Sequence, residues 1–182
     1  TRGREEMKSK IGIACLTAVL FLSGCDAVLT ETPITLEMET GLGKELVGKW
    51  KSEDSILEVT FSGGKNAEVS WMDQDEKKRA DLRGLRKEDW IYFSFLPKDD
   101  EDLLFWFFCA CKLKTKDELV LFLPRSDEFQ KLVTEGKIKG VVEKGKYSAT
   151  VKVDEGPALL QLIAENPDKY LKEAEDPITR VP

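Results

Sequence analysis

The chain has 182 residues, of which 41% are hydrophobic and 34% charged, a balance typical of one folded domain with a heavily charged surface. The formal net charge is -6, and it becomes -8 after residue 24, because four of the bases and two of the acids precede that point. An acidic chain disfavours nucleic acid as a partner. The absence of histidine removes the commonest general base near neutral pH, so serine or cysteine triads of the standard kind are excluded.

Residues 1–24 have the pattern of an export signal. A short basic start at Met7-Lys8-Ser9-Lys10 precedes an uncharged apolar run from Ile11 to Phe21. This run is much shorter than the roughly 20 residues that a transmembrane helix needs. The pattern therefore predicts a signal peptide that begins at Met7.

The signal ends at Leu22-Ser23-Gly24-Cys25, which resembles the lipobox of bacterial lipoproteins. This resemblance implies cleavage before Cys25 and acylation of that cysteine, so that the chain is held on a membrane by lipid. The alternative is an ordinary cysteine behind an ordinary secretory signal. Asp26 resembles the sorting residue that keeps lipoproteins of enteric-type bacteria in the inner membrane. We therefore expect a lipid-anchored protein of the cell envelope, on the periplasmic face of the inner membrane in preference to the outer membrane.

Residues 25–45 are expected to form the lipidated N-terminus and a flexible tether, because they are polar, contain Pro33, Gly41 and Gly43, and lack sustained periodicity. An edge strand at Pro33–Leu36 is the alternative. Residues 46–182 are then a single globular domain.

Alternating apolar and polar residues predict antiparallel strands through the middle of the chain. The segments 57–61 and 67–71 alternate on either side of the glycine-containing turn 63–66, which is a hairpin signal. Further strands are expected at 79–83, 90–96, 103–113, 119–123, 138–143 and 147–153.

Two helices are expected late in the chain. Asp127 and Gln130 have the spacing of a capping box, and Gly136 stands where a C-terminal cap belongs. Pro157 begins a second helix, which Asn166-Pro167 ends before a polar tail. The predicted fold class is mainly β (α+β): an antiparallel sheet of about seven to nine strands, curled into a small barrel or half-barrel, with one helix between late strands and one C-terminal helix.

Gly48-Lys49-Trp50, at the first strand, resembles the Gly-x-Trp signature of lipocalins and lipocalin-like bacterial lipoproteins. In that family the tryptophan closes one end of the barrel and packs against an arginine from a late strand. The late strands predicted at 138–153 contain no arginine. The alternative interpretation of Trp50 is a core aromatic residue at the start of a strand.

Cys109-Ala110-Cys111 lies on a predicted strand, where residues two apart point to the same face about 7 Å from each other. A disulfide would require a bulge, because its β-carbons must approach to about 4 Å. A metal site at the thiol pair would need two carboxylate ligands, because the chain has no histidine. The acidic clusters at 73–76 and 99–102 could chelate calcium, but they are better interpreted as solvated turns. We therefore interpret the cysteines as two buried thiols on an apolar face and expect no metal and no cofactor.

The segment 103–108 is apolar on both faces, which indicates either a central strand covered on both sides or a binding surface. The candidate surface for a ligand or partner consists of Trp90, Tyr92, Trp106 and Phe108.

No catalytic set is apparent, so the favoured hypothesis is a non-enzymatic binding module for an apolar ligand or an envelope protein. A filled core without a cavity would exclude the ligand carrier. The alternative is an acidic assembly or inhibitor lipoprotein that binds a basic protein. An enzyme that uses carboxylates or the thiol pair is a third hypothesis.

Overall fold

The computed structural model describes residues 27–52, 55–62, 67–73, 75–98, 104–144 and 149–182. The signal segment, Cys25 and Asp26 lie outside the described residues, so their predicted roles stay predictions. No helix in the described ranges is long and apolar enough to cross a membrane.

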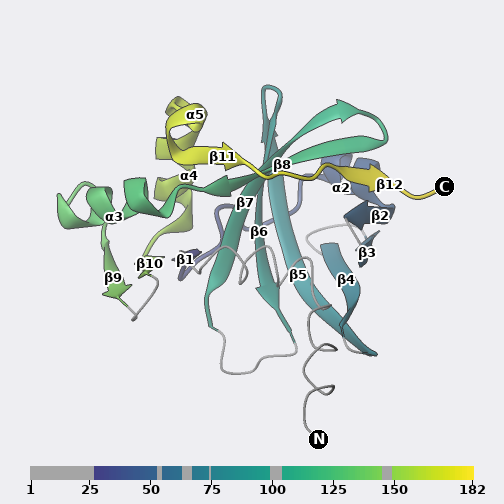
Figure 1. The fold of residues 1–182 in the computed structure, drawn as a ribbon, viewed down its shortest axis with the longest axis horizontal. Coiled ribbons are helices and arrows are strands. Elements are labelled where there is room, and N and C mark those ends of the chain that lie inside the picture. The colour runs from purple at the N-terminus through teal and green to yellow at the C-terminus, as the bar shows by residue number, and fades with distance from the viewer. Residues whose placement is uncertain (1–26, 53–54, 63–66, 74, 99–103, 145–148) are drawn as a thin grey trace, which may run out of the picture.

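Eight strands of the described chain close into an antiparallel barrel (Figure 1), as the fold-class prediction required. Around the barrel the order is β8, β12, β2, β3, β4, β5, β6, β7 and back to β8. The bounds are Gly48–Ser52 (β2), Ser55–Phe61 (β3), Ala67–Asp73 (β4), Glu76–Lys87 (β5), Trp90–Pro97 (β6), Trp106–Thr115 (β7), Glu118–Pro124 (β8) and Ile178–Arg180 (β12).

The first barrel hairpin follows the alternation of apolar and polar residues in the sequence. Leu57 lies opposite Trp71 and Phe61 opposite Ala67; Leu57, Trp71 and Ala67 belong to one apolar cluster inside the barrel, and Phe61 packs against it. The predicted strands at 79–83 and 90–96 are confirmed as parts of β5 and β6, and β5 extends well beyond the predicted bounds because it pairs with two neighbours.

Further strands extend the sheet beyond the barrel. β1 (Ala27–Thr30) pairs with β7 and runs parallel to β10 (Ala149–Val153), which forms a hairpin with β9 (Gly140–Lys144). β11 (Leu171–Glu173) pairs with β8. The late hairpin predicted at 138–153 is therefore confirmed, but it lies outside the barrel.

Four helices are present in the described residues: α2 (Thr40–Leu46), α3 (Ser126–Thr134), α4 (Gly156–Glu165) and α5 (Pro167–Tyr170). Figure 1 shows α3, α4 and α5 gathered on one side of the barrel with β9 and β10, while α2 lies with β2 and β3 on the other side. The outer wall of β6, β7 and β8 and these three helices enclose a second apolar cluster, in which Phe129, Leu159 and Ile163 are fully buried.

The helix at 126–134 was predicted correctly, but its capping box does not form. Arg125 occupies the N-cap position, and no side chain caps the helix. The helix begins two residues earlier than the box requires, so Asp127 lies inside its first turn. Gly136 follows the helix with a φ of +69°, as predicted for a residue that reverses the chain.

The tether predicted at 25–45 is wrong for residues 27–45. Val28, Ile34, Met38 and Leu42 are all at most 4% exposed. The amide of Ile34 donates to the buried Ser94 hydroxyl at 3.0 Å, so this segment is fastened to β6 outside any strand, and the alternative edge strand at 33–36 does not form either. Burial of apolar side chains holds the segment to the barrel.

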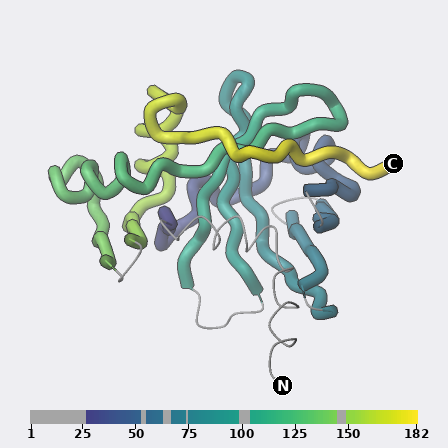
Figure 2. The backbone as a smooth tube through the Cα atoms, in the orientation of Figure 1, coloured from purple at the N-terminus to yellow at the C-terminus, as the bar shows by residue number. Residues whose placement is uncertain are grey.

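The polar tail predicted after the last helix is also wrong. In Figure 2 the C-terminal segment runs from the helices across to the opposite side of the barrel. It first forms β11 and then β12, which lies between β8 and β2 and completes the barrel wall. Ile178 points into the core and is 7% exposed.

Candidate functional site

The barrel encloses a cavity of about 100 Å³. Every lining side chain is apolar or a thiol: Leu46, Trp50, Leu57, Val59, Val69, Leu82, Phe93, Phe95, Cys109, Cys111, Leu119, Leu121 and Ile178. We call this cavity the lumen. An apolar cavity of this kind accepts an apolar guest, because the guest gains dispersion contacts and the lining side chains offer little to bind a water molecule.

Trp50 closes the lumen at the end where β2 begins and the turn between β7 and β8 lies. Its side chain is 1% exposed, and its indole N–H donates to the Leu46 carbonyl at 2.8 Å. That carbonyl belongs to the last turn of α2, so the bond ties the helix to the first barrel strand. A buried indole N–H needs such a partner.

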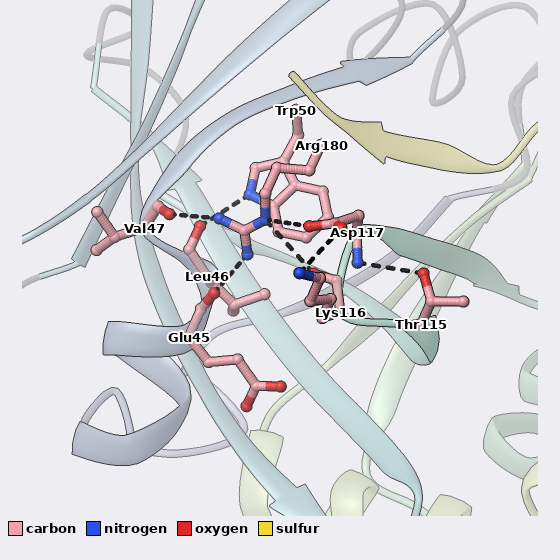
Figure 3. A network of polar contacts seen from close by, with 8 residues as sticks. All are labelled: Glu45, Leu46, Val47, Trp50, Thr115, Lys116, Asp117 and Arg180. Atoms are coloured by element: carbon pink, nitrogen blue, oxygen red, sulfur yellow. Dashed lines mark hydrogen bonds and ion pairs between the residues drawn. The ribbon is translucent and has the colours of Figure 1, made fainter. Parts of the chain in front are cut away.

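Arg180 covers Trp50 from the outside (Figure 3). Its guanidinium carbon lies 4.2 Å from the centre of the indole ring. Two of its N–H groups donate to the carbonyls of Val47 at 2.8 Å and Glu45 at 2.7 Å, and its Nε lies 3.4 Å from the Asp117 carboxylate. One planar cation thus joins β12, the end of α2 and the turn between β7 and β8, a task suited to the forked donors of arginine.

Gly48 makes room for this arrangement. Its φ is +128°, a conformation that side-chain-bearing residues rarely adopt, and a β-carbon at this position would lie 3.1 Å from Nη1 of Arg180. The backbone conformation and the nearby guanidinium therefore explain why the first residue of the Gly48-Lys49-Trp50 motif is a glycine. Any side chain here would strain the backbone and crowd the guanidinium.

Arg180 is the site residue that the sequence pattern does not identify, because the late strands predicted at 138–153 contain no arginine. Those strands lie outside the barrel, and the partner of Trp50 comes from the C-terminal strand instead. One signal was available: Arg180 is the only arginine after Arg125.

Cys109 and Cys111 are free thiols on the inward face of β7, and the predicted apolar face is confirmed. Of the two thiols predicted to be buried, Cys111 is buried and Cys109 is half-buried. Burial raises the pKa of the Cys109 thiol to about 12. Burial also raises the pKa of Cys111 well above its usual value, with the neighbouring Cys109 as the next contribution. Both groups stay protonated near neutral pH, so neither is an activated nucleophile.

The four aromatic residues proposed as a surface do not share one open face. Trp90, Tyr92 and Phe108 are 6%, 1% and 1% exposed and belong to the second apolar cluster, between the barrel wall and the helices. Trp106 is partly exposed at the start of β7, and the guanidinium of Arg83 lies 5.7 Å from its ring centre. The apolar faces of β7 are therefore explained by a central strand covered on both sides.

The described residues contain no group of three cysteine, aspartate or glutamate side chains arranged to hold a metal ion. The acidic segment 99–102 lies outside the described residues.

No protein-family model matches the chain, and the comparisons with curated proteins and with solved structures return no match either.

Proposed function

We propose that this chain is a lipid-anchored binding protein of a bacterial cell envelope, with a lipocalin-like barrel whose lumen takes a small apolar ligand. The observation that carries the proposal is the lumen, which has no polar lining atom to orient a reacting group and no activated nucleophile. Its chemistry suits binding by apolar contact and not catalysis.

The lipocalin-like interpretation is supported by the arrangement around Trp50. The Gly48-Lys49-Trp50 motif resembles the family signature, and Arg180 supplies the stacked arginine that the resemblance implies.

The size of the lumen restricts the ligand. Engineered apolar cavities of about 150 Å³ bind benzene. A lumen of about 100 Å³ therefore suits a guest no larger than a small hydrocarbon, or the end of an acyl chain, unless the barrel expands.

We expect benzene to raise the melting temperature of the full chain by about 2–4 °C, because a ligand that binds only the folded state stabilises it. Cys109→Phe should abolish this increase, since a ring at that position fills the lumen. Ile56→Phe is the matched control, because Ile56 is 50% exposed on β3 and does not line the lumen. An equal increase in the parent and in Cys109→Phe would place benzene elsewhere and contradict the proposal.

The proposed anchor predicts that Cys25→Ser loses membrane attachment. Fractionation of the expressing bacteria should recover the parent chain in the membrane pellet, with an acylated Cys25 peptide by mass spectrometry. The variant should carry no acyl group and should not be cleaved before residue 25. Cys15→Ser is the control within the same segment, because it leaves the lipobox intact. Acylation that persists in Cys25→Ser would refute the assignment.

A further inference from the structure

A second cavity, of about 600 Å³, lies on the outer face of the barrel. It is formed where the turn between β5 and β6 meets the junction of α4 and α5. Its lining residues are Lys87, Glu88, Trp90, Tyr92, Gln161, Ala164, Glu165, Pro167 and Asp168. We call it the outer cleft. It shares no residue with the lumen and has the volume typical of a ligand site.

The floor of the outer cleft is aromatic, buried and incompletely hydrogen-bonded. Trp90 and Tyr92 are 6% and 1% exposed, yet within the described ranges neither the indole N–H of Trp90 nor the hydroxyl of Tyr92 has a hydrogen-bond partner. The polar atoms themselves are not buried, because the buried side-chain atoms without a partner in the described residues belong to Thr30, Trp71 and Asp73. Since Trp90 and Tyr92 line the cleft, an occupant of the cleft can accept hydrogen bonds from the indole N–H and the hydroxyl.

The ring faces of this floor are already in use. Nζ of Lys112 lies 4.0 Å from the centre of the Trp90 ring. The Tyr92 ring stacks between the rings of Trp90 and Phe108, with distances between ring centres of 6.2 and 6.5 Å. A ligand can therefore contact the polar atoms at the edges of these rings but cannot stack on their faces. This disfavours a sugar or an aromatic ring as the occupant, since both are held by stacking.

Tyr92 stays a donor at neutral pH. Burial, followed by the negative charges of Asp89 and Glu88, raises the pKa of Tyr92 to about 12. Its protonated hydroxyl and the Trp90 N–H thus both favour an acceptor on the ligand, such as a carbonyl oxygen.

The rim of the outer cleft is acidic. Glu88, Glu165 and Asp168 are exposed on it, against one cation at Lys87. These three carboxylates do not form a metal-holding group within the described structure. A rim with this excess of negative charge attracts a cation and repels a carboxylate or phosphate.

We propose that the outer cleft binds a basic residue of a polypeptide, with its cationic N–H groups on the rim carboxylates and its backbone carbonyl on the N–H of Trp90 and the hydroxyl of Tyr92. A basic residue within a peptide carries both the positive donors and the acceptor that the cleft requires. A bare amine lacks the acceptor. This site does not depend on the lumen or on the proposed anchor.

The test uses the full chain in a non-ionic detergent, with N-acetyl-Gly-Arg-Gly-amide as the probe. The indole N–H signals of the four tryptophans are followed by NMR, and the Trp90 signal is assigned with Trp90→Phe. The Trp90 signal should shift and saturate with the arginine peptide. The same peptide with neutral citrulline should bind about tenfold more weakly, and methylguanidinium, which lacks the carbonyl, about threefold more weakly. No shift of the Trp90 signal, or equal binding of the citrulline peptide, would overturn the proposal.

Two substitutions separate binding from folding. Tyr92→Phe removes a hydroxyl with no protein partner, so the melting temperature should stay within about 2 °C of the parent while the peptide binds about threefold more weakly. Glu165→Gln with Asp168→Asn should weaken binding by a similar factor. Glu155→Gln is the control, because Glu155 precedes the same helix but does not line the cleft. A large loss of stability in Tyr92→Phe, or unchanged affinity in the rim variant, would refute the site.

Discussion

Trp50→Ala should lower the free energy of unfolding by about 4 kcal/mol, the largest effect expected of any single truncation in the barrel. The substitution empties the closed end of the lumen, leaves the Leu46 carbonyl without its indole donor and removes the surface on which Arg180 rests. Urea denaturation followed by circular dichroism measures the change.

Trp106→Ala is the matched control for this substitution. Trp106 is a tryptophan in a barrel strand, but it is partly exposed on the outer face, so its loss should cost only about 1 kcal/mol. Arg180→Met should lower the free energy of unfolding by about 2 kcal/mol, because it removes two short hydrogen bonds to backbone carbonyls. Arg180→Lys should show a similar loss, because an ammonium group cannot reproduce the planar pair of donors of a guanidinium. A similar loss of unfolding free energy in Trp50→Ala and Trp106→Ala would show that the closed end of the lumen does not stabilise the barrel more than an outer residue does.

A chain that begins at Leu46, the predicted start of the domain, should fail to fold. It lacks β1 and five side chains that are at most 6% exposed, which are Val28, Leu29, Ile34, Met38 and Leu42. Each contributes about 2 kcal/mol by burial, so their sum is comparable with the whole stability of a typical domain. Circular dichroism and NMR dispersion measure the outcome.

A chain that begins at Ala27 is the control for this truncation. It lacks only the segment outside the described structure and should unfold cooperatively. Cooperative unfolding of the chain that begins at Leu46 would show that residues 27–45 are a tether after all.

Long amphipathic strands are predictable because every second residue points to the buried face and is apolar. The hairpin of β3 and β4 and strand β5 follow this rule. β6, β7 and β8 are apolar over consecutive residues, because their inner faces belong to the barrel core and their outer faces to the second apolar cluster. β11 and β12 have three residues each, too few for any period to be visible. Their positions depend on pairing with β8 and β2, which are distant in sequence.

The tether prediction for residues 27–45 rests on their polar composition, on Pro33, Gly41 and Gly43, and on the lack of sustained periodicity. Gly43 instead lies under the ring of Phe61, where a β-carbon would approach the ring to 2.7 Å. A signal of packing was present, since Ile34, Met38, Leu42 and Leu46 recur every four residues and all are buried. Only the last two lie in a helix, so the spacing did not correspond to one regular element.

The candidate site was predictable only in part. The aromatic residues and the thiols of β6 and β7 were identified from the sequence, but their assignment to the lumen or to the outer wall depends on which way the sheet closes. That closure requires β12, and β12 also brings Arg180 to Trp50. A site whose two main residues are separated by most of the chain leaves no local pattern.

β1 begins at Ala27, only two residues after Cys25. Consecutive α-carbons are 3.8 Å apart, so the α-carbons of Cys25 and Ala27 lie within about 8 Å of each other. If Cys25 carries the proposed acyl group, this short spacing would hold the folded domain directly at the membrane surface. The ligands proposed for the domain would then come from the bilayer or from molecules held at the same surface.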